Sequence, residues 1–126
     1  MILTLDFSGE TPIYMQIRNQ IVMGIASGQL CSGEKLPTIR TLGDQFGINM
    51  MTVNKAYQLL KQEGYIVTDR RVGAVVQGPL SSGLSLAAQD QLRLLISEAK
   101  MHHMSKTELL DLCAEIYDTM EGGNKS

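Results

Sequence analysis

Residues 36–76 constrain the fold of this chain more than any other part of it. They contain two helix-type repeats of apolar residues, separated by Gly47, and then two short β-type runs at 65–67 and 74–76. Helix, turn, helix and hairpin is the order of elements in a winged helix-turn-helix, a module that places one helix in the major groove of DNA. The stretch therefore predicts a mainly α fold with a small β-hairpin.

Both helices of this stretch carry start and stop signals. Thr38 and Asn49 are suited to cap helix N-termini, and Gly47 is suited to the left-handed residue that ends the first of them. Gly64 should end the second. Helical spacing predicts that the first helix buries Ile39, Leu42 and Phe46, and that the second buries Val53, Ala56, Tyr57 and Leu60.

The segments on either side extend the pattern. Alternation over residues 2–7 predicts a short strand or extended arm, and Thr11-Pro12 should open a helix that stops near Gly28. Residues 30–35 read as a loop. After a Gly/Ser-rich linker at 78–83, two more helices are expected, one over about 86–104 and one that opens with a capping box from Ser105 to Glu108.

We therefore expect a DNA-binding domain over residues 1–78, a linker over 79–85, a two-helix segment over 86–121 and a disordered tail over 122–126. The helix pair is too short to bury much surface by itself. It must pack on the first domain, on a second copy of the chain, or on both.

Composition and charge exclude several classes. The first 78 residues carry seven Lys/Arg against six Asp/Glu, and the other 48 carry four against seven, so the net charge of −2 gives little sign of a nucleic-acid partner. No apolar run approaches the roughly 20 residues of a membrane span, and the start does not resemble a signal peptide, which favours the cytoplasm. The two cysteines, Cys31 and Cys113, are expected to be free and buried.

Residues 36–76 also resemble the GntR family of bacterial repressors. The family pattern stands here as Leu36-Pro37-Thr38-Ile39-Arg40-Thr41-Leu42-Gly43, then Thr52-Val53-Asn54-Lys55-Ala56-Tyr57, Glu63-Gly64, and Arg71-Val72-Gly73-Ala74-Val75-Val76. The opening, with Leu5-Asp6 and Pro12-Ile13-Tyr14-Met15-Gln16-Ile17, is similar to that of the short YtrA-like subfamily. The resemblance covers about residues 2–78.

This resemblance implies a dimeric, sequence-specific repressor that binds a palindromic operator in double-stranded DNA. It also implies that the last two helices serve in dimerisation, with contacts by Leu92, Leu95, Ile96, Leu109, Leu112 and Ile116. The DNA contacts are then expected from Thr38, Arg40, Asn49, Met51, Thr52, Asn54, Lys55, Gln58, Arg70, Arg71 and Gly73.

The residue types of that set agree with DNA recognition. Opposite the buried stripe of the second helix lie Met51, Asn54, Lys55 and Gln58, with Thr52 at one edge. Amides can pair with adenine edges, lysine can reach guanine or phosphate, and methyl groups can contact thymine. Arg40 and the hairpin arginines suit phosphates or the minor groove.

Three positions depart from the family pattern. Family members with a longer sensor domain often have Arg where Met50 and Asn54 stand here. The exposed face of the second helix, the reading face, is therefore poorer in Arg, which suggests A·T-rich recognition. Arg71 replaces the first glycine of the hairpin turn, and Thr38 replaces a serine.

The sequence also allows other interpretations. A polar helix face is usually only solvated, Arg40 could simply pair with Asp44, and the hairpin arginines could guard a strand edge. A winged helix could serve protein–protein contact, and His102, His103 and Cys113 could form a metal or redox sensor. The sequence shows no catalytic constellation, cofactor motif or metal motif, and it does not reveal whether a small-molecule effector exists.

Overall fold

The computed structural model describes residues 3–77 and 82–121, which form two compact units that divide near residue 80. The N-terminal unit contains α1 (Ile13–Ala26), α2 (Ile39–Phe46), α3 (Met50–Glu63), β1 (Ile66–Asp69) and β2 (Gly73–Val76). The C-terminal unit contains α4 (Leu86–Met101) and α5 (Lys106–Glu121). Of the predicted linker, residues 82–85 fall within the second unit and residues 79–81 lie outside the described residues, as does the whole predicted tail.

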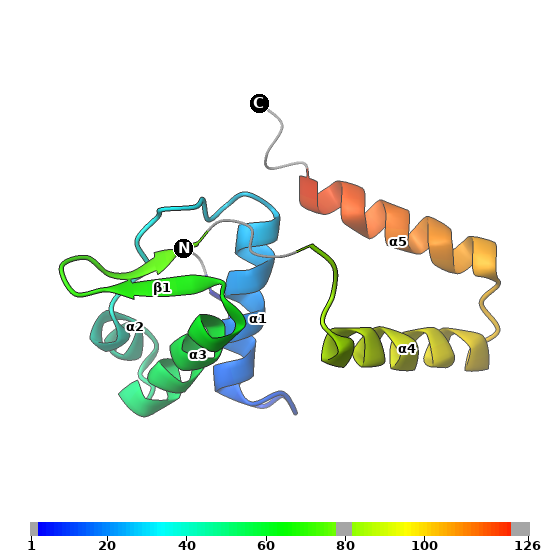
Figure 1. The fold of residues 1–126 in the computed structure, drawn as a ribbon. Coiled ribbons are helices and arrows are strands. Elements are labelled where there is room, and N and C mark those ends of the chain that lie inside the picture. Colours follow the sequence, from blue (N-terminus) through cyan, green and yellow to red (C-terminus); the bar gives the residue numbers. More distant parts are fainter. Residues whose placement is uncertain (1–2, 78–81, 122–126) are drawn as a thin grey trace. The chain divides into compact units, whose positions relative to one another are not determined.

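The N-terminal unit is a winged helix-turn-helix, as predicted. Helix α3 packs against α1, α2 and β1, and Figure 1 shows α2 and α3 beneath the hairpin. β1 and β2 pair antiparallel from Ile66 opposite Val76 to Asp69 opposite Gly73. The predicted stripe of α3 is buried in full, and the core consists of Leu3, Ile17, Ile21, Leu30, Leu36, Leu42, Val53, Ala56, Tyr57, Leu60, Ile66 and Val76.

The segment expected as a loop before α2 pairs with the hairpin. Lys35 forms an antiparallel bridge with Val75, supported by N–H donation from Leu36 to the carbonyl of Ala74 at 2.9 Å and from Val76 to that of Glu34 at 2.9 Å. Residues 34–36 therefore form a third extended segment beside β2. This pairing joins the start of α2 to the β1–β2 hairpin, which is the wing of this fold, although nothing in the loop sequence indicated it.

The N-terminal arm is extended and is held on α1 by two glutamine side chains. The amide of Gln20 accepts from the N–H of Thr4 at 2.8 Å and donates to its carbonyl, and Gln16 does the same for Asp6 at 2.8 Å on both sides. Each glutamine side chain thus makes the pair of backbone hydrogen bonds that a neighbouring strand would make. The second donor proton of Gln16 goes to the carbonyl of Thr11. The N-cap of α1 is Pro12, so no side chain caps this helix.

An ion pair ties α1 to the end of α3. Arg18 donates to both carboxylate oxygens of Glu63 at 2.9 Å, and its guanidinium carbon lies 5.8 Å from the ring centroid of Tyr65. The Glu63 carboxylate raises the pKa of Arg18. Arg18 is the cation of the one salt bridge found among the described residues, and it is therefore committed to holding the unit together.

The C-terminal unit consists of two antiparallel helices joined by a turn (Figure 1). Helix α4 ends at Met101, three residues earlier than predicted, because His103 adopts a left-handed φ of 63° that breaks the helix. The predicted capping box forms: the N–H of Ser105 donates to Glu108 at 2.9 Å, which lowers the pKa of that carboxyl, and the N–H of Glu108 donates to Ser105 Oγ at 3.1 Å. No helix within the described segments is both long and apolar enough to cross a membrane.

Candidate nucleic-acid interface

Two caps fix the ends of the helix pair that carries the candidate residues. Thr38 Oγ1 accepts from the N–H of Thr41 at 3.0 Å, and Asn49 Oδ1 accepts from that of Met51 at 2.7 Å. Gly47 lies at φ 64°, a conformation that glycine adopts without strain, and it ends α2 as predicted. The side-chain oxygens of Thr38 and Asn49 are therefore used in capping, so DNA contact by Asn49 would fall to its amide NH2 group.

The exposed face of α3 holds the remaining candidates of that helix. Met51 is 77% exposed, and Asn54, Lys55 and Gln58 are also exposed, whereas Thr52 is half-buried. These side chains project from a helix whose opposite face is locked into the core. The arrangement presents a stable surface of amide, ammonium and methyl groups, which is the chemistry that base edges and phosphates require.

The structure divides this face into two flanks. Asn54 and Gln58 border a concave groove between α3 and the wing. Lys55 points the other way, toward α1, where its ammonium lies 4.1 Å from the ring centroid of Tyr14. The predicted reading face is thus not one uniform surface.

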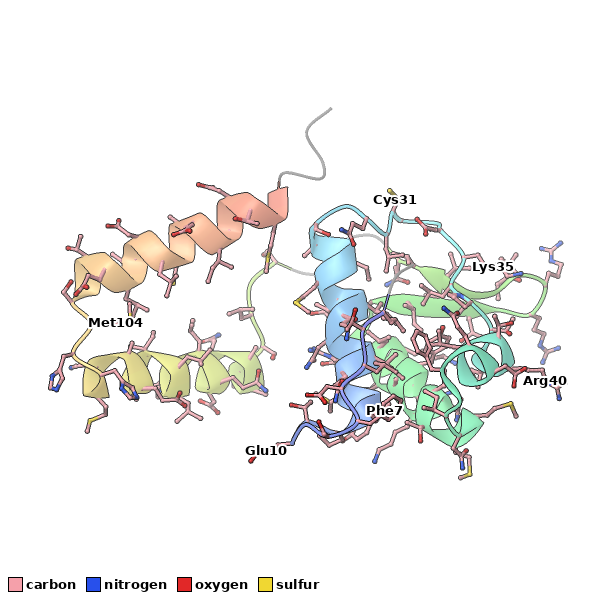
Figure 2. All side chains as sticks on the ribbon, turned by 180° about the vertical axis from the view of Figure 1, so that it is seen from behind. Phe7, Glu10, Cys31, Lys35, Arg40 and Met104 are labelled. Carbon is pink, nitrogen blue, oxygen red and sulfur yellow. The ribbon has the colours of Figure 1, made fainter. Side chains whose placement is uncertain are left out.

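The groove on the wing side has a volume of about 420 Å³. Its floor is apolar and includes Leu36, Tyr57 and Ile66, and basic residues from three elements surround it. Arg40 lies on the first turn of α2, Lys61 on α3, and Lys35 on the segment that pairs with β2. Figure 2 shows Lys35 and Arg40 on the side of the unit where α2 and the hairpin lie.

The turn of the wing is shaped by two short-range features. Asp69 Oδ1 accepts the N–H of Arg71 at 2.8 Å, and Gly73 has a φ of 100°, which a residue with a Cβ rarely adopts. Arg70 and Arg71 are exposed in this turn. The predicted position of the arginine pair at the tip of the hairpin is therefore correct.

The cations of this surface are free to meet an external anion. Within residues 3–77 and 82–121, Arg40 forms no ion pair with Asp44, and no acidic side chain forms a salt bridge with Lys35, Lys61, Arg70 or Arg71. Sequence reasoning missed the contribution of Lys35, Lys61 and Thr68 to the groove. Their proximity arises from the pairing of distant segments, for which the local sequence has no signal.

The two cysteines differ from the prediction. Both are exposed free thiols: Cys31 follows the buried Leu30 in a loop, and Cys113 lies on α5, which buries none of its described side chains in this chain alone. His102 and His103 lie exposed at the α4–α5 turn. The described part of the chain contains no group of three or more His, Cys, Asp or Glu side chains placed to bind a metal ion together.

The helices α4 and α5 leave large apolar side chains uncovered. Leu95 is 61% exposed and Ile116 is 48% exposed, and Leu92, Ile96 and Leu112 are also exposed, whereas Leu109 is half-buried. Monomeric proteins rarely expose apolar surface on this scale without a partner. The predicted apolar stripes are therefore present and available for contact.

Comparison with known proteins supplies a family. A family model described as "Bacterial regulatory proteins, gntR family" matches residues 13–76. The HTH-type transcriptional repressor YtrA of Bacillus subtilis (strain 168) is 32% identical over 126 residues, which cover 97% of each chain. Further relatives are likewise named as HTH-type transcriptional regulators.

Solved structures of transcriptional regulators are also similar to this chain. A protein described as a transcriptional antiterminator from Listeria monocytogenes EGD-e has a TM-score of 0.85 at 27% identity, covering 98% of this chain and 95% of the other. The AraR DNA-binding domain in complex with operator ORX1 has a TM-score of 0.53 at 29% identity, covering 59% of this chain and 95% of that domain. In the second of these structures the domain is bound to its operator.

Proposed function

The chain belongs to the GntR family of bacterial regulatory proteins, and from this premise we propose that it is a dimeric repressor that binds a palindromic DNA operator in the cytoplasm. Residues 1–78 form the DNA-binding domain, 79–85 the linker and 86–121 the dimerisation segment. Membership of a family of transcriptional regulators makes DNA the expected partner of the exposed helix face.

One observation supports DNA binding most directly. The recognition helix α3, the start of α2 and the wing surround one concave groove, which three basic side chains line, and two more lie exposed in the wing turn. None of the five forms a salt bridge with an acidic side chain among the described residues. They are Lys35, Arg40, Lys61, Arg70 and Arg71. A surface of this kind attracts phosphates, and each phosphate contact releases condensed counterions, which makes binding weaken as salt rises.

The division of labour follows the geometry. Met51, Asn54 and Gln58 face bases in the major groove, where the two amides suit adenine and the methionine suits the thymine methyl group. Arg40 contacts a phosphate, and the backbone at Gly73 lets the wing arginines approach the minor groove or its phosphates. Thr38 and Asn49 contribute by capping the starts of α2 and α3, and the half-buried Thr52 contributes beside the exposed face of α3.

Dimerisation completes the proposal. The uncovered apolar side chains of α4 and α5 pack against a second copy, with Leu92, Leu95, Ile96, Leu109, Leu112 and Ile116 at the contact. Two recognition helices related by a twofold axis then match a palindrome whose half-sites lie about one helical turn, or a multiple of it, apart. Doubling the contact compensates for a reading face that is poor in arginine.

Selection of bound DNA from a random pool tests this proposal. The expected result is enrichment of a palindromic, A·T-rich site whose affinity falls steeply with salt in a fluorescence anisotropy titration. Absence of enrichment, with binding that does not respond to salt, would instead favour the alternative in which the winged helix serves protein–protein contact.

A further inference from the structure

The contact between Tyr14 and Lys55 joins the first turn of α1 to the recognition helix. The Lys55 ammonium lies 4.1 Å from the centroid of the Tyr14 ring, well inside the roughly 6 Å over which a ring face attracts a cation. Tyr14 is half-buried and packs against the core, so the ring is held in place, whereas Lys55 is exposed. An otherwise flexible side chain is therefore tethered to a fixed platform.

This tether determines where the charge of Lys55 can act. Along α3 each residue turns by about 100°, so Lys55 lies on the side of the exposed face opposite to Met50 and Lys61, which line the groove with the wing. The ring sits on α1, outside the face that points directly away from the core. The lysine is thus directed to one edge of the recognition helix.

We infer that Tyr14 is a positioning residue that holds Lys55 for contact with a DNA phosphate on the α1 side of the major groove, across from the wing. This inference rests on the proposed DNA-binding function. A cation–π contact uses the charge of the ammonium and leaves its N–H groups free to donate to a phosphate oxygen. Because the ring orders the side chain before binding, less conformational entropy is lost when the phosphate is contacted.

Three variants test the inference. Tyr14→Phe keeps the ring face, Tyr14→Leu keeps apolar packing but removes the ring, and Lys55→Met keeps the stem but removes the charge. In the free protein, NMR should show the Lys55 ε-CH2 protons shifted upfield by the ring in the wild type and in Tyr14→Phe. The shift should disappear in Tyr14→Leu.

The DNA measurements separate positioning from a structural role. Lys55→Met should lower the dependence of log K on log salt by about one, and should weaken binding equally across related sites. As a single substitution, Tyr14→Leu should weaken DNA binding about two- to fivefold. Added to Lys55→Met, it should cause no further loss of binding. Tyr14→Phe should bind like the wild type.

Lys61→Met is the matched control, since Lys61 lies on the same helix but lines the wing-side groove. The losses from Tyr14→Leu and Lys61→Met should multiply. Multiplying losses for Tyr14→Leu and Lys55→Met would overturn the inference, and altered preference at a single base pair in Lys55→Met would reassign Lys55 to base reading. Absence of any DNA binding overturns the proposed function instead, while an unshifted Lys55 in the wild type overturns the contact itself.

Discussion

The hydroxyl of Tyr57 donates a hydrogen bond of 2.7 Å to the carbonyl oxygen of Pro37. Tyr57 belongs to the buried stripe of α3, and Pro37 immediately precedes the N-cap of α2. The bond therefore sets the first turn of α2, which carries Arg40, against the recognition helix. This one hydrogen bond, between residues twenty positions apart, therefore both positions α2 and stabilises the N-terminal unit.

Tyr57→Phe should lower the free energy of unfolding by about 1 kcal/mol, because it removes this hydrogen bond and leaves the Pro37 carbonyl without that partner. Urea denaturation followed by circular dichroism measures the change. Tyr65→Phe is the control, since the Tyr65 hydroxyl makes no side-chain hydrogen bond among the described residues. Equal stability of Tyr57→Phe and wild type would show that the bond contributes nothing.

The same residue predicts a pH dependence. Burial raises the pKa of Tyr57 well above its ordinary value of about 10. The folded state then keeps a proton that the unfolded chain loses, so this stabilisation is complete below pH 10 and declines above it by about 1.4 kcal/mol per pH unit. The advantage of the wild type over Tyr57→Phe should shrink above pH 10 and reverse by about pH 11. A constant difference from pH 8 to pH 11 would contradict the assignment.

Arg40→Ala should weaken operator binding about tenfold at low salt and reduce the salt slope by about one, because a phosphate contact is lost. Its stability should stay within about 0.5 kcal/mol of the wild type, since Arg40 is exposed. Fluorescence anisotropy at several salt concentrations measures both quantities. Arg93→Ala, on α4, should leave binding unchanged, and an unaltered slope in Arg40→Ala would remove its assigned role.

Ile116→Asp should convert a dimer into a monomer, because it places a charge among apolar side chains that we propose to pack against the partner. Analytical ultracentrifugation measures the mass, and anisotropy should show weaker operator binding. Ser97→Asp on α4 lies away from Leu92, Leu95 and Ile96 and should remain dimeric. A chain ending at Gly78 should also be monomeric yet folded, since the described N-terminal core closes without α4 and α5.

His103 should respond to substitution through its backbone conformation. Its φ of 63° is strained for a residue with a Cβ and most strained for a β-branched one. His103→Gly should raise the free energy of unfolding by about 0.5 kcal/mol, and His103→Val should lower it by about 1 kcal/mol. Thermal denaturation of the two variants side by side checks the sign, and identical melting of both would mean that the turn carries no such strain.

The sequence alone determined the local structure of the DNA-binding unit. Helical spacing identified the buried stripe of α3, and the caps at Thr38, Asn49 and Ser105 were readable because each depends on residues within one turn. The same reasoning located the arginine pair in the wing turn. These features depend on short-range geometry, which neighbouring residues encode directly.

The tertiary structure decided what depends on residues far apart in the chain. The pairing of Lys35 with Val75, the bond from Tyr57 to Pro37 and the ring of Tyr14 under Lys55 join separate elements, and together they form the groove and divide the reading face. The prediction that Cys31 and Cys113 are buried was also wrong, because both are exposed. Burial and charge placement depend on how elements pack against one another, and residue type and spacing along one segment do not specify that packing.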